Sequence, residues 1–287
     1  MLGDLVEDVV VWVDGPLRHG TDSAARVFRR RGGSAANVAA FASGSHPVRF
    51  LGCVGPDPVG DSVVAELGGH GVDVRVQRRG RTGSIVVLID QDGERTMLPD
   101  RGAATMLEPV PEEWLDGLTH LHVPGYSFDG EPVGAAAVDA LDRVRRAGGT
   151  TSVDASSTGM LEQYGRERFL ALLAELAPTF VFANRSEAEC LGLLVDGLPG
   201  PARARLAATT VVTKAGAEPT TVDVPGRASF AVAVPPVAEV RDLTGAGDAF
   251  AAGFLAEYLE GADLRRAAEA GHRSAARVLA SPGASVG

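Results

Sequence analysis

The chain has 287 residues, of which 45% are apolar and 22% charged, with a formal net charge of −10, as is typical of a globular protein with a substantial core. Its one basic run, 29–31, is too short for a nucleic-acid surface, and no stretch approaches the roughly 18 apolar residues of a membrane span. Cys53 and Cys190 form neither a disulfide framework nor a metal spacing, so we expect a cytoplasmic protein whose partners are small molecules, not nucleic acid or membrane.

The first third of the chain is rich in predicted strands and turns. Hydrophobic alternation predicts strands at 9–13 and 25–30, joined by the turn-forming segment 14–16. Further strands flank the hairpin turn 91–93. Because these strand-rich segments lack helical partners, we expect them to form a separate small sheet. The remaining elements predicted here are helices 37–41 and 62–67 and strands 72–76, 85–89 and 96–98.

From residue 133 onward, predicted helices and strands alternate. This pattern predicts an α/β fold with a parallel sheet covered by helices on both faces. Ligands bind such sheets at the carboxyl ends of the strands, where Asn184, Gly216 and Asp248 fall. Ser186 and Glu189 have the spacing of a capping box for the helix that follows strand 180–182. The elements are helices 133–146, 168–176, 247–259 and 264–279, strands 151–153, 180–182 and 210–213, and strands near Val222 and Val232.

Segment 242–248 (DLTGAGD) joins a glycine-rich turn to an apolar helix and places Asp248 in the first helical turn. The backbone N–H groups of Gly245, Ala246 and Gly247 can converge on an anion, and the helix adds the positive end of its dipole. A carboxylate there suits a general base that takes a hydroxyl proton while the amides hold a transferring phosphoryl group. A capped helix after a loop is the simpler interpretation of the same residues.

Segment 32–40 (GGSAANVAA) places two glycines before a helix of small residues, in which Asn37 interrupts an apolar face. The motif fits tight helix packing, with Asn37 as a satisfied buried group. It also fits a surface where a polyol approaches Gly33 and bonds to Asn37. The basic run 29–31 leads into this motif on a strand that should be exposed, so we expect its side chains to be solvated.

With both motifs present, the chain resembles the ribokinase-type (PfkB) carbohydrate kinase family, which pairs Gly-Gly-x-x-x-Asn with Asp-x-x-Gly-Ala-Gly-Asp. The resemblance extends from Gly3 to about Gly283. It implies a ribokinase-like three-layer α/β fold with a mostly parallel central sheet, helices on both faces and a small β lid. We expect one domain, 1–287, with the lid built from about 6–32 and 82–99. Further matching segments are 3–8, 52–60, 82–96, 184–187 and 211–218.

The resemblance also implies a function: an ATP-dependent kinase that transfers the γ-phosphoryl group to a hydroxyl of a small sugar or polyol. Asp248 would be the base, and the glycine turn, Gly245, Ala246 and Gly247, would hold the phosphoryl group. Asp8 falls at the position of the family's sugar-binding aspartate. Asp8 and Asn37 would therefore orient the acceptor, with Gly33 allowing its close approach.

Cofactors follow from the same resemblance. Glu187 would place Mg²⁺ through water, and Asp242 matches a residue that holds a potassium ion in the family. A homodimer through the lid is a further expectation. The residues that would bind the nucleotide are Asn184, Glu187, Thr213 and Gly216.

Three departures from the family pattern affect these expectations. Only Met1 and Leu2 precede the opening motif, so the strand usually found there is clipped or the chain starts upstream. Val6 stands where ribokinase has asparagine, which leaves ribose open as the acceptor. Pro219 stands where the nucleotide turn often has a second glycine, which leaves the fit around the adenosine open.

Alternative functions stay open at this point. A nucleoside kinase of the adenosine or pseudouridine type would need a flat wall for the base, for which Trp12 and Phe28 are the aromatic candidates. A sugar-phosphate kinase and a ligand-binding regulator without catalysis are further alternatives.

Lysine and histidine usage adds two observations. Lys214 is the only lysine among 27 basic residues. A Walker A motif needs a lysine followed by serine or threonine, and Ala215 follows this lysine, so the chain has no such motif. Either a contact with the nucleotide or chance explains the presence of Lys214. His120 and His122 would share one face of a strand, and without a third ligand we expect them to be strand residues and not a metal site.

Overall fold

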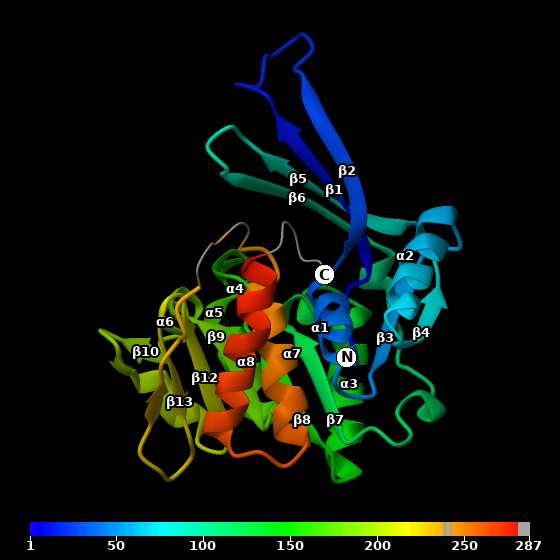
Figure 1. Cartoon of the computed structure of the whole chain (residues 1–287). Coiled ribbons are helices and arrows are strands. Elements are labelled where there is room, and N and C mark those ends of the chain that lie inside the picture. The colour runs from blue at the N-terminus through cyan, green and yellow to red at the C-terminus, as the bar shows by residue number, and fades with distance from the viewer. Residues whose placement is uncertain (238–239, 241–242, 281–287) are drawn as a thin grey trace.

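The computed structural model describes residues 1–237, 240 and 243–280. Its centre is a six-stranded sheet in the order β14-β13-β12-β9-β8-β7. Strands β7, β8, β9 and β12 are parallel, and β13 and β14 continue antiparallel at one edge (Figure 1). The strands are β7 (His120–Pro124), β8 (Thr150–Asp154), β9 (Phe180–Asn184), β12 (Thr210–Ala215), β13 (Glu218–Asp223) and β14 (Phe230–Val232).

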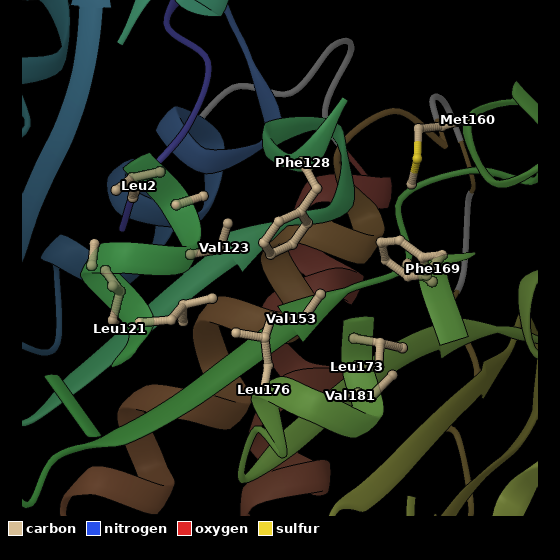
Figure 2. Packing of buried hydrophobic residues seen from close by; sticks show 14 of the residues in the cluster. Leu2, Leu121, Val123, Phe128, Val153, Met160, Phe169, Leu173, Leu176 and Val181 are labelled. Atoms are coloured by element: carbon tan, nitrogen blue, oxygen red, sulfur yellow. The ribbon is translucent and has the colours of Figure 1, made fainter. Parts of the chain in front are cut away.

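Helices cover both faces of this sheet, and strand β9 shows why. Side chains alternate along a strand, so Val181 packs into one core cluster while Phe180 and Phe182 pack into the other. Figure 2 shows the first cluster, where Val181 lies near Phe169 and Leu173. The first face carries α3 (Val133–Arg146), α4 (Thr158–Tyr164), α5 (Arg166–Leu176) and α6 (Arg185–Cys190), and the second carries α1 (Ser34–Ser43), α7 (Ala246–Leu259) and α8 (Leu264–Leu279).

The first three residues connect this sheet to a second pair of parallel strands. The Leu2 N–H donates to the His122 carbonyl at 3.0 Å, and the Gly3 N–H donates to the Leu51 carbonyl at 3.1 Å. Leu2 also forms an isolated parallel bridge with Leu51 of the second pair. The strand pair is β3 (Arg49–Val54) and β4 (Asp73–Arg78), with α2 (Pro58–Gly69) between them in sequence.

A separate four-stranded sheet has the order β2-β1-β5-β6, with β1 parallel to β5 and the other pairs antiparallel. It stands above the body of the molecule, on the side where α7 begins (Figure 1). The strands are β1 (Val6–Val13), β2 (Ala25–Gly32), β5 (Thr82–Ile89) and β6 (Arg95–Gly102).

The α/β fold with helices on both faces of the sheet is confirmed, and the bounds of α3 and α8 are those predicted. The predicted strand 72–76 corresponds to β4 and pairs with β3, because α2 makes a parallel β-α-β unit of the two strands. β3 and α4 were not predicted. Among the described residues, no helix has the length and apolar character needed to cross a membrane. Short elements are β10 (Leu194–Val195), β11 (Leu198–Pro199) and single turns of 3₁₀ helix at Ala103–Met106, Glu112–Trp114, Gly125–Phe128 and Pro201–Leu206.

Candidate active site

Helix α7 begins after a left-handed glycine and has no side-chain cap. Gly245 has φ of 77°, a conformation that residues with a Cβ rarely adopt. The Ala246 N–H bonds to the Leu243 carbonyl at 3.3 Å. Gly247 and Asp248 follow in the first turn, where N–H groups have no partner within the helix and the dipole is positive. The start of α7 therefore has the properties of an anion site.

Asp248 is the centre of a hydrogen-bond network that joins two distant segments. Its Oδ1 accepts from the Ser34 hydroxyl at 2.7 Å and its Oδ2 accepts from the Asn37 amide at 3.0 Å. Burial raises the pKa of Asp248 to about 6, with the charge of Asp154 adding to the effect, while the two hydrogen bonds and Lys214 oppose it. The carboxylate is therefore oriented and has a pKa near the range in which a general base works.

Both ends of the Asn37 side chain are engaged within the protein. While its amide donates to Asp248, its Oδ1 accepts from Nη1 of Arg31 at 3.0 Å. Arg31 is 4% exposed, so the expectation of a solvated side chain is wrong for this residue, although Arg29 is exposed and pairs with Glu7. The error has a physical cause, since Arg31 lies between Asn37 of α1, to which it donates, and Glu66 of α2, whose carboxylate is 3.9 Å away. Arg31, Asn37 and Asp248 form one chain of contacts.

Asp8 lies against Gly32, the first glycine of segment 32–40, which was not among the expected site residues. A Cβ at Gly32 would lie 2.0 Å from Oδ1 of Asp8, so Gly32 makes room for this carboxylate. Gly33, expected to admit the acceptor, also lies against the main chain, because its Cβ would lie 2.2 Å from the Asp4 carbonyl oxygen. Burial raises the pKa of Asp8 to about 6 against the opposing charges of Arg30 and Arg31.

An ion pair that sequence reasoning missed lies next to these residues. Arg101 donates from Nε to Oδ2 of Asp4 at 2.7 Å and from Nη2 to Oδ1 at 2.9 Å, while its Nη1 donates to the Asp129 carbonyl at 2.9 Å. Such a bidentate pair fixes the orientation of both side chains. It ties the end of β6 to the opening motif, and the only signal in the sequence is an arginine just before a glycine at the end of a strand.

Asn184 and Glu187 form a reciprocal cap at the start of α6. Asn184 accepts from the Glu187 N–H at 2.9 Å, and the two oxygens of Glu187 accept from the Asn184 N–H at 2.7 Å and from its amide at 2.6 Å. The capping box is therefore this pair and not Ser186 with Glu189, because the N-cap of α6 lies at Asn184, two residues earlier than expected, and β9 continues to that same residue. Burial and the charge of Asp154 raise the pKa of Glu187 to about 7, while Lys214 lowers it.

Lys214 and Asp154 join the ends of β12 and β8. Nζ of Lys214 donates to Oδ2 of Asp154 at 2.9 Å, and both side chains are largely buried. The charges of Asp154, Glu187 and Asp248 counteract the effect of burial and raise the pKa of Lys214. The ammonium therefore stays protonated at the carboxyl ends of the parallel strands.

The remaining predicted residues lie apart from this network or beyond the described residues. Thr213 is buried in β12 beside Ala183, and Gly216 is the left-handed residue of the β12–β13 turn, with open space around it. Asp242 lies outside the described residues.

The paired histidines of β7 make contacts typical of a structural role. His120 bonds to Thr150 and Ser152, and His122 bonds to Ser152. Burial lowers the pKa of both rings, so both are neutral. Within the described part of the chain, no group of three or more His, Cys, Asp or Glu side chains is arranged to hold a metal ion.

The four-stranded sheet reaches over the start of α7. Arg95 of β6 donates to the Thr244 hydroxyl, next to the glycine turn. Val10 pairs with Phe28 on one side and with Val87 on the other, and strand alternation puts all three on the same face as Asp8. This face therefore presents a carboxylate next to an apolar row.

Comparison with known proteins places the chain in a family of enzymes. Residues 1–287 match the pfkB family carbohydrate kinases. The chain is 31% identical to a fructokinase of Klebsiella pneumoniae over 265 residues, 89% of this chain and 82% of that protein. It is 32% identical to an ATP-dependent ribose-1-phosphate kinase of Halopiger xanaduensis over 271 residues, 91% of this chain and 85% of that protein.

Solved structures share the fold. An adenosine kinase from Sinorhizobium meliloti superposes with a TM-score of 0.85 at 24% identity, over 99% of this chain and 94% of that one. A putative ribokinase II from E. coli, in complex with ATP and Mg²⁺, gives 0.83 at 24% identity, over 99% and 92% of the two chains. The expected family is confirmed by these matches, and the chain belongs to the pfkB family of carbohydrate kinases, phosphotransferases that act on an alcohol group.

Proposed function

We propose that the enzyme transfers the γ-phosphoryl group of ATP to a hydroxyl of a small sugar or polyol. The observation that carries this proposal is the position of Asp248. It lies in the first turn of an uncapped helix, is oriented by Ser34 and Asn37, and has a pKa of about 6. A base and an anion site in adjacent residues suit the transfer of a phosphoryl group to a hydroxyl.

The acceptor hydroxyls would bind at Asp8. This carboxylate lies on the face of the four-stranded sheet that carries the apolar row, and we propose that the sheet is the lid of the site. Asn37 would act mainly on Asp248, because both ends of its amide are engaged there and with Arg31. Asp248 would remove the acceptor proton. Its orientation would therefore depend on Asn37, which is itself held by Arg31 at the end of β2.

The donor set at the ends of β8 and β9 fits a magnesium ion. Mg²⁺ keeps several of its waters and takes one or two carboxylates together with substrate phosphates, and Asp154 lies close enough to Glu187 for its charge to raise the pKa of Glu187. Because Asn184 occupies both oxygens of Glu187, we propose that Glu187 acts through water.

Asp242 would hold a potassium ion, on the strength of the motif alone. We assign the enzyme to the cytoplasm, where ATP is available and two free thiols would stay reduced.

A nucleoside acceptor is the second candidate, and a specific observation favours it. Phe28 is 53% exposed, and Trp12 is 40% exposed two residues beyond Val10, so both can present a flat apolar surface on the face of Asp8. Adenosine kinases are among the enzymes that share this fold. The same residues could equally cover a sugar.

An ADP-release assay with fructose, ribose, ribose-1-phosphate, adenosine and pseudouridine tests the proposal. We expect a free sugar to give the highest kcat/KM, no turnover without Mg²⁺, and a higher rate with K⁺ than in its absence. A nucleoside that exceeds every sugar by about tenfold, which is 1.4 kcal/mol in transition-state binding, would establish the second candidate instead. Absence of ADP release with every acceptor would refute the kinase proposal.

The outer face of the four-stranded sheet suits contact with a second copy of the chain. On the face opposite Asp8, Val11 pairs with Val27 and with Leu88, and Val86 pairs with Leu98. Val27 and Leu98 are 56% and 52% exposed, and exposed apolar rows of this kind mark interfaces. We expect a dimer in sedimentation equilibrium at micromolar concentration, converted to monomer by Val27→Asp. A wild-type monomer under these conditions would argue against the interface.

A further inference from the structure

Lys214 is an exception in a chain that otherwise uses arginine for every basic position. The structure places this single ammonium at the end of β12, paired across the sheet with Asn184 and bonded to Asp154 at 2.9 Å. Its side chain is 15% exposed. Lysine carries a compact point charge and arginine a planar fork, so this is the one basic position of the chain with a compact charged group.

The ammonium also lies beside the start of helix α7. A Cβ built at Gly247 would lie 3.3 Å from Nζ of Lys214, so the glycine leaves the space beside the ammonium open. Gly247 is the second residue of α7 and precedes Asp248. Two positive features, the uncapped helix start and the ammonium, therefore meet next to the base.

The charges around Lys214 are mostly negative. Asp154, Glu187 and Asp248 all lie close enough to raise its pKa. These carboxylates would repel the phosphates of a nucleotide, and Lys214 is the cation among them that lies beside the helix start. An ammonium held by one carboxylate still has two N–H groups to donate.

We infer that Lys214 is a catalytic residue, whose ammonium donates to the transferring phosphoryl group together with the N–H groups of the first turn of α7, while Asp154 holds it in place. The inference rests on the proposed function. The acceptor oxygen forms a bond to the γ-phosphorus as the bond to the oxygen bridging to the β-phosphorus breaks, and Asp248 takes the hydroxyl proton. Lys214 neither gains nor loses a proton, and its charge stabilises the phosphoryl oxygens as ADP leaves.

The competing interpretation is that Lys214 only neutralises Asp154. Lys214→Met alone does not separate the two roles, because it leaves a buried carboxylate without its partner and can unfold the protein. The double variant Asp154→Asn, Lys214→Met removes both charges together. Asp154→Asn alone is the matched control. It keeps the ammonium of Lys214, and any effect of losing the Asp154 carboxylate on Mg²⁺ binding is the same in this variant and in the double variant.

The main measurement is the affinity of each variant for ATP and for ADP, by calorimetry in the presence of Mg²⁺ and without acceptor. Relative to Asp154→Asn, the double variant should lose about tenfold in ATP affinity and change little in ADP affinity, because the lysine would contact the terminal phosphate. With the best acceptor, kcat should also fall by about 10²-fold, as for the loss of one preorganised donor.

Two results would overturn the inference, and they are distinguishable. If wild type binds nucleotide and turns over but the double variant matches Asp154→Asn in kcat and in its ATP-to-ADP affinity ratio, Lys214 is a structural partner of Asp154 only. If wild type binds neither ATP nor ADP, the proposed kinase function fails and the role of Lys214 fails with it.

Discussion

Asp248→Asn should fold normally and lower kcat by about 10²–10⁴, the usual range for loss of a general base. The amide keeps the shape of the side chain and can still accept from Ser34, but it cannot take a proton from the acceptor. The KM for ATP should change little, because the N–H groups of the first turn of α7 do not depend on the carboxylate. Near-normal turnover in the folded variant would remove Asp248 from the mechanism.

The stability of this variant provides an internal control. The pKa of Asp248 is raised from 3.8 to about 6 in the folded protein, so folding disfavours the ionised form and stability is lower above pH 6 than it would be for a neutral group. Asparagine removes this effect but replaces the oxygen that accepts from Asn37 by an NH2 group, so the gain and the lost hydrogen bond oppose each other and the Tm at neutral pH should change little. A variant that is slow and also less stable would indicate damage to the fold and not the loss of a base.

The pH dependence of the wild-type turnover rate should report the ionisation of Asp248. The base must be ionised, so the rate should fall about tenfold per pH unit below pH 6. Asp8 has a pKa in the same region. The acid limb of kcat should persist in Asp8→Asn if it reports Asp248, and its disappearance there would assign the limb to Asp8.

Asp8→Ala should lower kcat/KM for the acceptor by about 10²–10⁴ and leave the KM for ATP within about twofold. Each hydrogen bond to a charged group contributes about 1.5–3 kcal/mol, and the carboxylate would bind two hydroxyls of the acceptor. Steady-state kinetics with each substrate varied in turn measures the two effects separately. Equal losses for ATP and acceptor would contradict a role in acceptor binding.

Asp8→Asn is the matched variant for this experiment. It keeps the volume of the side chain over Gly32 and one oxygen acceptor but loses the charge that faces Arg30 and Arg31. Its loss in kcat/KM should lie between those of wild type and Asp8→Ala. If the two variants lose equally, the charge of Asp8 and not its hydrogen-bonding geometry binds the acceptor.

Local pattern predicted the helices of the body well, because α3 and α8 have apolar faces at helical spacing and their ends are polar. Strand β3 was missed because Gly52 lies inside it and the sequence around it was interpreted as a turn. The partnership of Asn37 with Asp248 joins residues 211 positions apart, so no local rule indicates it. A resemblance to a family brought these two residues together where periodicity could not.

Charged residues were the hardest to place. A run of three arginines is usually solvated, yet Arg31 is buried, with Asn37 of α1 and Glu66 of α2 beside its guanidinium. Asp154 and Arg101 stand alone in the sequence, without motif or repeat. Both lie at the ends of strands beside the site, where a polar residue after a buried strand is the only signal that a sequence offers.

A single lysine also determines how this protein can be handled chemically. Amine-reactive dyes, crosslinkers and coupling surfaces normally find lysines on the outside, whereas the ε-amine here is paired with Asp154 and the Met1 amine donates to the Arg49 carbonyl at 2.7 Å. Acylation of Lys214 would therefore appear in intact mass spectra as one adduct per chain, slow to form and prevented by a bound nucleotide. Immobilisation should instead use an introduced surface cysteine or an affinity tag, so that the attachment chemistry does not block the site.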